Sequence, residues 1–339
     1  MKNFKIGFAC KWIDNDNQIK GIKDIDDCKK YNTMTTTMKW LASQKKDAAE
    51  EKLFSVILHN TKSVRLLVER VAKLKPELRM VRISSEILPF YTHPDWVYFY
   101  QKQDVISAIA KNLSGISEFA KLHNVRLSMH PGQFCVLASA DENIAKRSIE
   151  EFEYHADLAR FMGYGNSFQD FKINIHISGK KGPEGLRAVY GKLSPEARNC
   201  ITVENEEMSY GVESCLELSD IIPTVLDIHH HWIKTGNYIE LENEDTKKVI
   251  DSWRGARPTM HYSISREDIL VGHSCEDLPN MVNLLSTGYK KQHLRAHSDF
   301  YWNAKVNQWA GSFLESFDIM CESKAKNLAS EKFFLEINT

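Results

Sequence analysis

Eight short apolar runs, separated by longer helical segments, constrain the fold of this chain more than any other feature. Each run is four to six residues long with β-branched side chains, as in buried strands, and they span residues 5–10, 79–84, 126–129, 172–177, 200–203, 223–228, 259–263 and 333–337. Helical spacing is clearest at 46–74, 101–123, 140–162, 211–220, 244–253 and 310–330. Alternating strands and helices predict an α/β protein with a parallel sheet. Because eight strands close a (β/α)8 TIM barrel, we predict that fold, with an open doubly wound sheet as the alternative.

The length alone would allow about two domains, but the strand–helix alternation runs without a long polar linker, so we predict one domain over residues 1–339. The connections at 11–78 and 264–332 are longer than one helix requires, and we interpret them as insertions into a single barrel. Hydrophobic residues make up 42% and charged residues 26%, which is typical of a globular protein. No apolar run approaches 18 residues, so we expect no membrane span, and the N-terminal apolar stretch is too short for a signal peptide.

Cysteine usage and charge exclude several function classes. The seven cysteines are scattered and include no C-x-x-C pair, which argues against a disulfide framework and predicts a reducing, intracellular, cytoplasmic setting. The net charge of −1 argues against a protein that coats DNA through a wholly basic surface. A local groove or bound metal ions could still attract nucleic acid. Neither a G-x-G-x-x-G nor a P-loop motif occurs, so we expect no nucleotide cofactor.

Imidazole and carboxylate groups recur at the carboxyl halves of six successive predicted strands. They are His130, His176, Glu204, Asp227, His261 and Glu336. A single strand histidine is more often a hydrogen-bonded core residue, and a single acid is as often a helix cap. Six in succession favour a shared site, because the carboxyl ends of barrel strands converge. Buried carboxylates need compensation, and mixed nitrogen and oxygen ligands suit zinc, manganese or iron. The pattern therefore predicts a divalent metal site there.

These residues stand in motifs that resemble the UV damage endonuclease (UvdE) family, whose barrel is similar to that of endonuclease IV. The motifs are Gly7-Phe8-Ala9-Cys10, Arg82-Ile83-Ser84-Ser85 through Pro89 to His93-Pro94, Ser128-Met129-His130-Pro131-Gly132-Gln133-Phe134, His176-Ile177-Ser178-Gly179, Glu204-Asn205-Glu206, Asp227-Ile228-His229-His230-His231, His261-Tyr262-Ser263, Ala296-His297-Ser298-Asp299 and Glu336. The resemblance covers nearly the whole chain, and the order and spacing of the motifs make it specific.

The resemblance implies up to three divalent metal ions, with Mn²⁺ expected and Zn²⁺, Co²⁺ or Mg²⁺ as alternatives. His130, His176 and Glu204 would hold the first. Glu204 would bridge to a second that Asp227, His261 and Glu336 complete. His230 and His297 would hold the third. His93 and Glu204 match the catalytic residues of the family.

Three further positions match residues that probe the DNA lesion. Gln133 and Phe134 correspond to a Gln–aromatic pair of the family, and Phe8 to a position that is usually Tyr. A planar ring can replace base stacking that damage has removed. One departure concerns the third metal site: family members often carry Lys two residues before the seventh-strand histidine, where this chain has Thr259.

The resemblance implies a metal-dependent DNA repair endonuclease that cuts the phosphodiester bond 5′ to UV photolesions, and other distorting damage, in duplex DNA. We expect a monomer that acts on damaged double-stranded DNA without a membrane partner. A metal-dependent sugar isomerase or epimerase of the xylose isomerase-like type is the alternative, since such barrels also gather His, Glu and Asp around metals. A lesion-binding protein with a degenerate metal site is a third reading.

Overall fold

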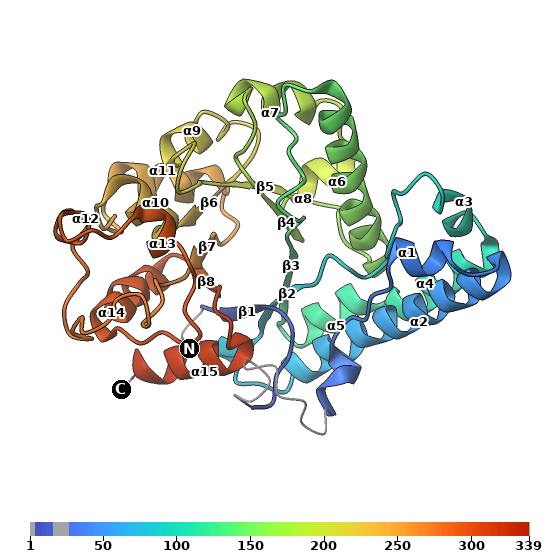
Figure 1. The fold of residues 1–339 in the computed structure, drawn as a ribbon, viewed down its shortest axis with the longest axis horizontal. Helices are drawn as coiled ribbons and strands as arrows, with labels where there is room; N and C mark the ends of the chain where they lie inside the picture. The colour runs from blue at the N-terminus through green and yellow to red at the C-terminus, as the bar shows by residue number, and fades with distance from the viewer. Residues whose placement is uncertain (1–3, 16–26, 339) are drawn as a thin grey trace.

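Eight parallel strands form a closed barrel, as predicted, and the open-sheet alternative is wrong. The computed structural model describes residues 4–15 and 27–338, so residues 16–26 of the first long connection lie outside the described residues. The strands pair in chain order around the ring, with helices outside them (Figure 1). They are β1 (Ile6–Cys10), β2 (Met80–Ile83), β3 (Arg126–Met129), β4 (Lys172–His176), β5 (Ile201–Glu204), β6 (Thr224–Asp227), β7 (Thr259–Tyr262) and β8 (Asp318–Cys321).

Helices cover the outside of the barrel. The longest are α2 (Lys46–Val71) and α6 (Glu142–Met162). The carboxylate of Asp141 caps α6 by accepting from the N–H groups of Asn143 and Ile144, and Gly163 ends it at a φ of 91°. The others are α1 (Met38–Ala42), α3 (Val97–Tyr100), α4 (Gln103–Leu113), α5 (Ile116–Leu122), α7 (Gly182–Tyr190), α8 (Pro195–Cys200), α9 (Val212–Leu216), α10 (Ile228–Thr235), α11 (Glu244–Ser252), α12 (Met281–Ser286), α13 (Lys291–Leu294), α14 (Ala304–Ser312) and α15 (Lys326–Glu336), with 3₁₀ turns at Asp27–Tyr31, Pro76–Leu78 and Phe313–Glu315.

The eighth strand is not where the sequence pattern placed it. The predicted strand 333–337 falls on the last turns of α15 and its end, and the predicted helix 310–330 contains β8 instead. In α15, Ala329, Ser330, Phe333 and Phe334 are buried while Leu335 is exposed, which is a helical pattern. A short apolar run cannot by itself distinguish a buried helix face from a strand.

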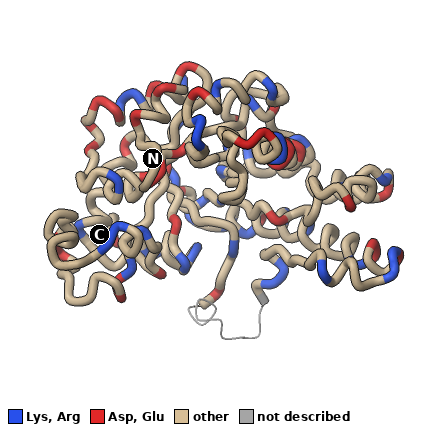
Figure 2. The backbone as a smooth tube through the Cα atoms, turned by 45° about the horizontal axis from the view of Figure 1, so that its top comes forward, with Lys and Arg blue, Asp and Glu red and all other residues tan. Residues whose placement is uncertain are grey.

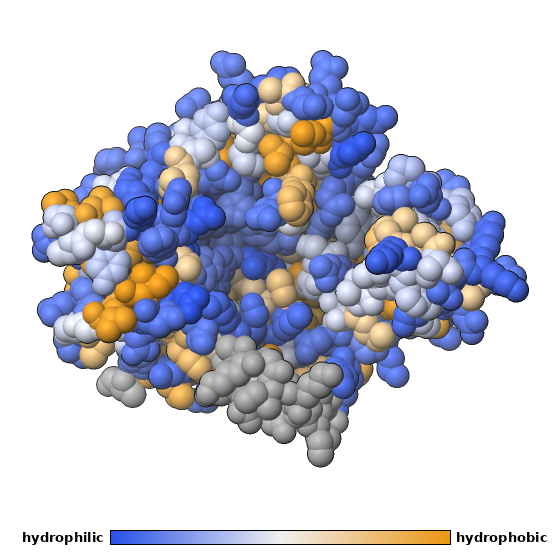
Figure 3. All heavy atoms as spheres, viewed as in Figure 1, coloured by the Kyte–Doolittle hydropathy of each residue, from blue (hydrophilic) through white to orange (hydrophobic). Residues whose placement is uncertain are grey.

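The inside of the barrel holds a small apolar cluster of Ala9, Met80 and Met320. A Cβ on Gly7 would lie 2.6 Å from Cγ of Met80, so this strand position requires glycine. Charges of both signs are interspersed along the chain (Figure 2). Hydrophilic residues line the hollow at the centre of the face in Figure 3. Among the described helices, none combines the length and apolar character needed to cross a membrane.

A buried histidine in α6 is expected to make stability depend on pH. His155 is fully buried, and burial lowers its pKa from 6.5 to about 4. Below pH 6.5 the unfolded chain therefore takes up a proton that the folded chain does not. The free energy of unfolding should fall as the pH drops from 6.5 to 4, by about 3 kcal/mol from this residue alone.

Urea unfolding between pH 4 and 7 tests this effect. His155→Gln should remove that part of the slope, whereas the control His293→Gln, at an exposed position of α13, should leave the wild-type slope. Equal slopes for wild type and His155→Gln would contradict the prediction.

Candidate metal centre at the carboxyl ends of the strands

Five of the predicted ligands lie together where the central strands end. His176, Glu204 and Asp227 are the last residues of β4, β5 and β6, His130 directly follows β3, and His261 lies in β7. Strand register pairs His176 with Glu204 and Asp227 with His261. The parallel barrel thus brings residues that are far apart in sequence to one level of its axis.

These side chains form two groups that share Glu204. The ligand atoms of His130, His176 and Glu204 all lie within 4.8 Å of one another, as do those of Glu204, Asp227 and His261. Nε2 of His130 is 3.4 Å from Oε2 of Glu204, and Nδ1 of His261 is 3.0 Å from Oε1. Glu204 is fully buried. A carboxylate placed between two histidine-containing groups can bridge two cations.

Neighbouring polar groups hold the candidate ligands in place. Asn174 donates to Oε2 of Glu204. Asn205 donates to the carbonyl of Asp227 and accepts from its N–H, each at 2.9 Å. His130 donates from Nδ1 to the carbonyl of Pro131 at 2.8 Å, which leaves its Nε2 facing Glu204. Such outer hydrogen bonds fix the orientation and tautomer of metal ligands.

Four buried atoms of the cluster make no well-formed hydrogen bond to the described residues, although two of them, Oε1 of Glu204 and Nδ1 of His261, lie 3.0 Å apart. They are Nδ1 of His176, Oε1 of Glu204, Oδ2 of Asp227 and Nδ1 of His261. Leaving a buried polar group unsatisfied costs about 1–3 kcal/mol. Four such atoms from four neighbouring strands are the arrangement that divalent cations would satisfy, and the donor set of nitrogen and oxygen suits zinc, manganese or iron. The residues present therefore fit metal ions.

The pKa values of the two acids in the cluster, Glu204 and Asp227, are shifted in opposite directions. Burial opposes ionisation of Glu204, but His261 and His176 hold its pKa well below the ordinary value. Burial raises the pKa of Asp227 well above the ordinary range, and it lowers the pKa of His261 to about 4. Neutral imidazoles are the form that binds metal ions.

The two residues expected at a third metal site lie beside these groups. His230 is in α10, where its Nδ1 donates to the carbonyl of Asn205 at 2.9 Å and its Nε2 is 3.6 Å from Glu207. Despite burial, the carboxylates of Asp227, Glu204 and Glu207 raise the pKa of His230 to about 9. His297 follows α13, and its ring lies 6.3 Å from that of His229. Neither joins the two tight groups formed by the described residues.

The placement of Glu336 in the cluster is wrong. This residue is at the end of α15 on the outside of the barrel, and Oε1 accepts from Asn307 at 2.8 Å. Glu322 directly follows β8, so it is the carboxylate at the carboxyl end of the eighth strand. Its Oε1 is 3.3 Å from Nδ1 of His261 and pairs with Arg82. Although burial opposes it, Arg82 holds the pKa of Glu322 well below the ordinary value.

Sequence reasoning also missed a buried lysine beneath the cluster. Lys172 begins β4 and is buried, and its Nζ lies 3.0 Å from Nε2 of His261. Burial lowers its pKa to about 7. Thr259, where the family often has lysine, is also buried, and its hydroxyl has no hydrogen-bond partner among the described residues. The lysine beside His261 thus comes from β4, not from β7.

The predicted lesion-probing residues divide into exposed and buried ones. Phe134 is 85% exposed on the loop after β3, and Gln133 beside it is exposed as well. Phe8 is 1% exposed and packs edge-on against Trp12, so its predicted contact with the lesion is wrong. His93 lies in the loop between β2 and α3, where its side chain is 39% exposed and its Nδ1 accepts from the N–H of Asp95 at 3.2 Å.

Comparisons with known proteins agree with this architecture. The UV-endonuclease UvdE family model matches residues 4–337. The UV DNA damage endonuclease of Bacillus mycoides (strain KBAB4) is 28% identical, with 92% of this chain and 91% of that protein covered. The putative UV-damage endonuclease of Acanthamoeba polyphaga mimivirus is 35% identical over 198 residues, 55% of this chain and 58% of that one.

Among solved structures, the crystal structure of SacUVDE matches with a TM-score of 0.72 and 26% identity, covering 99% of this chain and 98% of that chain. The family match extends across the barrel and includes every strand that carries a candidate ligand. The sugar isomerase and non-enzymatic alternatives are therefore set aside. This chain belongs to the UV-endonuclease UvdE family and is a DNA repair endonuclease.

Proposed function

We propose that this endonuclease cuts the phosphodiester bond immediately 5′ to a UV photolesion in duplex DNA, and that it requires divalent metal ions to do so. The metal requirement rests on four buried ligand atoms, of Glu204 and three neighbours, that make no well-formed hydrogen bond to the described residues. The proposal treats residues 1–339 as one catalytic domain that acts as a monomer inside the cell.

His130, His176 and Glu204 would hold one ion, and Glu204, Asp227, His261 and Glu322 a second. His230 and His297 would contribute to a third. Bound ions of this kind lower the pKa of water and stabilise charge on a phosphate. We expect Mn²⁺ to be the most effective ion, with Zn²⁺, Co²⁺ and Mg²⁺ as competitors.

The side chains of the chain itself position the substrate. Arg82 fixes the Glu322 carboxylate toward His261, so this ligand needs little rearrangement. His93 is 39% exposed, and because its Nδ1 accepts from the N–H of Asp95, Nε2 carries the ring proton and could donate it to a DNA phosphate. Gln133 and Phe134 extend into solvent from the loop that follows the ligand-bearing β3. In this proposal they enter the duplex where damaged bases stack weakly.

Incision of an end-labelled duplex with one cyclobutane pyrimidine dimer tests the proposal. With manganese present, we expect a single cut directly 5′ to the dimer that leaves a 3′-hydroxyl, and no cut in the undamaged duplex. Chelation with EDTA should abolish the cut, and added Mn²⁺ should restore it. Cutting that continues after chelation would contradict the metal requirement. Cutting elsewhere would contradict the proposed lesion geometry.

Phe134→Ala is expected to weaken lesion recognition without affecting the fold. Because the ring is 85% exposed, its removal should change the free energy of unfolding by less than about 0.5 kcal/mol. Loss of one base–aromatic stack costs about 1–3 kcal/mol, so affinity for the dimer duplex should fall about 5- to 150-fold.

Leu122→Ala is the matched control, since Leu122 is 80% exposed on α5. Fluorescence anisotropy with damaged and undamaged duplexes measures both affinities. An unchanged preference for damaged DNA in Phe134→Ala would contradict the probing role.

A further inference from the structure

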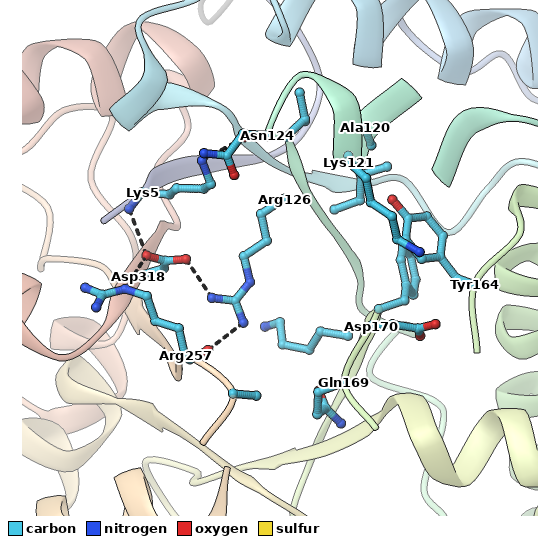
Figure 4. A pocket seen from close by; sticks show the side chains of 15 residues that line it. Lys5, Ala120, Lys121, Asn124, Arg126, Tyr164, Gln169, Asp170, Arg257 and Asp318 are labelled. Atoms are coloured by element: carbon cyan, nitrogen blue, oxygen red, sulfur yellow. Dashed lines mark hydrogen bonds and ion pairs between the residues drawn. The ribbon is translucent and has the colours of Figure 1, made fainter. Parts of the chain in front are cut away.

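A second cavity lies at the amino ends of the strands, opposite the metal-ligand cluster (Figure 4). Its volume is about 440 Å³. Arg126, Lys172 and Asp318 begin β3, β4 and β8, while Lys5 and Arg257 closely precede β1 and β7. The cavity is therefore built from strand starts, and four of these strands, β3, β4, β7 and β8, carry or lead into candidate ligands.

The charge around this cavity is unbalanced. Five cationic side chains and two carboxylates line it: Lys5, Lys121, Arg126, Lys172 and Arg257 against Asp170 and Asp318. The cationic excess remains even when Lys172 is neutral. The whole chain, by contrast, has a net charge of −1. Positive charge is thus concentrated at this end of the barrel.

One carboxylate, Asp318, binds two of these cationic side chains, Arg126 and Arg257, and also the backbone N–H of Lys5. Asp318 accepts from the N–H of Lys5 at 2.8 Å, from Arg126 at 2.6 Å and from Arg257 at 2.8 Å (Figure 4). The ammonium of Lys5 donates to the carbonyl of Asn124 at 2.7 Å, a neutral acceptor. Both oxygens of Asp170 accept backbone N–H groups in the turn that precedes β4. The carboxylates present leave cationic charge uncompensated.

The remaining wall is aromatic and apolar. Tyr164 and Phe171 lie in tilted contact, with ring centroids 5.0 Å apart. Gln169 also lines the cavity, and its Oε1 is buried without a hydrogen-bond partner among the described residues. The volume falls within the range of about 300–1,000 Å³ typical of small-molecule sites. A ligand with one anionic end and one organic end would match both walls.

We propose that this cavity binds a small phosphate-bearing anion. Arginine guanidinium groups and lysine ammonium groups both attract phosphate oxygens. Arg126 already donates to the carbonyl of Arg257, and Arg257 to the carbonyls of Leu314 and Phe317, so a phosphate would pair with the N–H groups that these contacts leave. The phosphate would lie against Arg126 and Arg257, with Lys121 at the rim, and an organic substituent would contact Tyr164 and Gln169. Lys172 lies between this cavity and the proposed catalytic centre: it lines the cavity, and its Nζ is 3.0 Å from Nε2 of His261.

Calorimetric titration of the full chain, with its metal ions present, tests the proposal with two probes, inorganic phosphate and adenosine monophosphate. Lys121 is exposed on α5, and its Nζ is 5.7 Å from the centroid of the Tyr164 ring, so its substitution leaves the Asp318 network intact. Lys121→Glu should weaken phosphate binding about 10-fold, whereas Lys111→Glu, on α4 and outside the lining, should have no effect.

Asp170→Asn should have the opposite effect on phosphate binding and tighten it about 3-fold, because it removes one negative charge from the cavity wall. Tighter binding of the monophosphate ester would identify an organic phosphate as the ligand, and equal binding would identify free phosphate.

A tungstate soak of crystals locates the oxyanion directly by anomalous scattering, with the expected position between Arg126 and Arg257. Three results would overturn the proposal: no saturable binding, a dissociation constant that Lys121→Glu leaves unchanged, or oxyanion density confined to the metal face. None of these readouts depends on DNA incision. The anion-site proposal can therefore be contradicted while the proposed incision activity holds, and the incision activity can be contradicted while the anion site holds.

Discussion

Glu204→Gln is expected to reduce incision of the dimer duplex by at least about 10³-fold, the upper range for loss of one preorganised electrostatic group. Glu204 is the only residue shared by the two groups of candidate ligands formed by the described residues. The amide has nearly the same shape but carries no charge. It also cannot offer two anionic oxygens to two cations at once.

Metal content should fall together with activity. In Glu204→Gln, the histidines on either side would lose the carboxylate that lies 3.0 Å from His261 and 3.4 Å from His130. Mass spectrometric metal analysis after gel filtration should therefore find at least one ion fewer per chain. Glu51→Gln, at an exposed position of α2, is the matched control and should retain both metal and activity.

Circular dichroism, measured together with metal content and incision, distinguishes loss of the metal site from loss of the fold. Circular dichroism should remain that of the wild type, because the barrel pairing does not depend on this side chain. A Glu204→Gln variant that is folded and metal-loaded and cuts within 10-fold of the wild type would contradict the bridging role of Glu204. A folded variant without metal and without activity would support it.

Much of the barrel could be predicted from sequence because seven strands are apolar runs bounded by turns or polar ends. Parallel strands deliver their carboxyl ends to one level, so His130, His176, Glu204, Asp227 and His261 could be placed together from chain order alone. The metal roles of these residues remain predictions, since what the structure provides is their proximity, burial and unpartnered atoms.

The errors have two physical causes. Sequence alone does not say which way a strand side chain points, and a short apolar run fits either a strand or a buried helix face. Phe8 sits in β1, where alternate residues face opposite sides of the barrel wall, and sequence does not state which side. Its ring faces the apolar cluster that includes Trp12 and Val68. Lys172 begins a strand and would ordinarily be solvated, yet it lies inside the barrel. Long-range packing decides both positions.

The eighth strand shows why a resemblance in order and spacing can still misplace a ligand. The run Asp318-Ile319-Met320-Cys321 is short and begins with a charged residue, whereas 333–337 contains two phenylalanines and an isoleucine. Only pairing with both β7 and β1 identifies the former as the strand that closes the barrel. Glu322 directly follows the first run and Glu336 is the second-last residue of the other, so the error moved the predicted carboxylate from Glu322 to Glu336.

Glu322→Gln is therefore expected to lower incision by about 10²-fold or more, while Glu336→Gln should leave it within about 2-fold of the wild type. Glu322 lies 3.3 Å from His261 and balances the buried guanidinium of Arg82, so the amide would leave that cation uncompensated. Glu336 accepts from Asn307, and a glutamine oxygen can still do so. Incision rates and metal content of the two variants, measured side by side, check the assignment. Loss of metal and activity in Glu336→Gln alone would return the ligand role to that residue, whereas the opposite result would show that the closing strand β8 completes the metal centre.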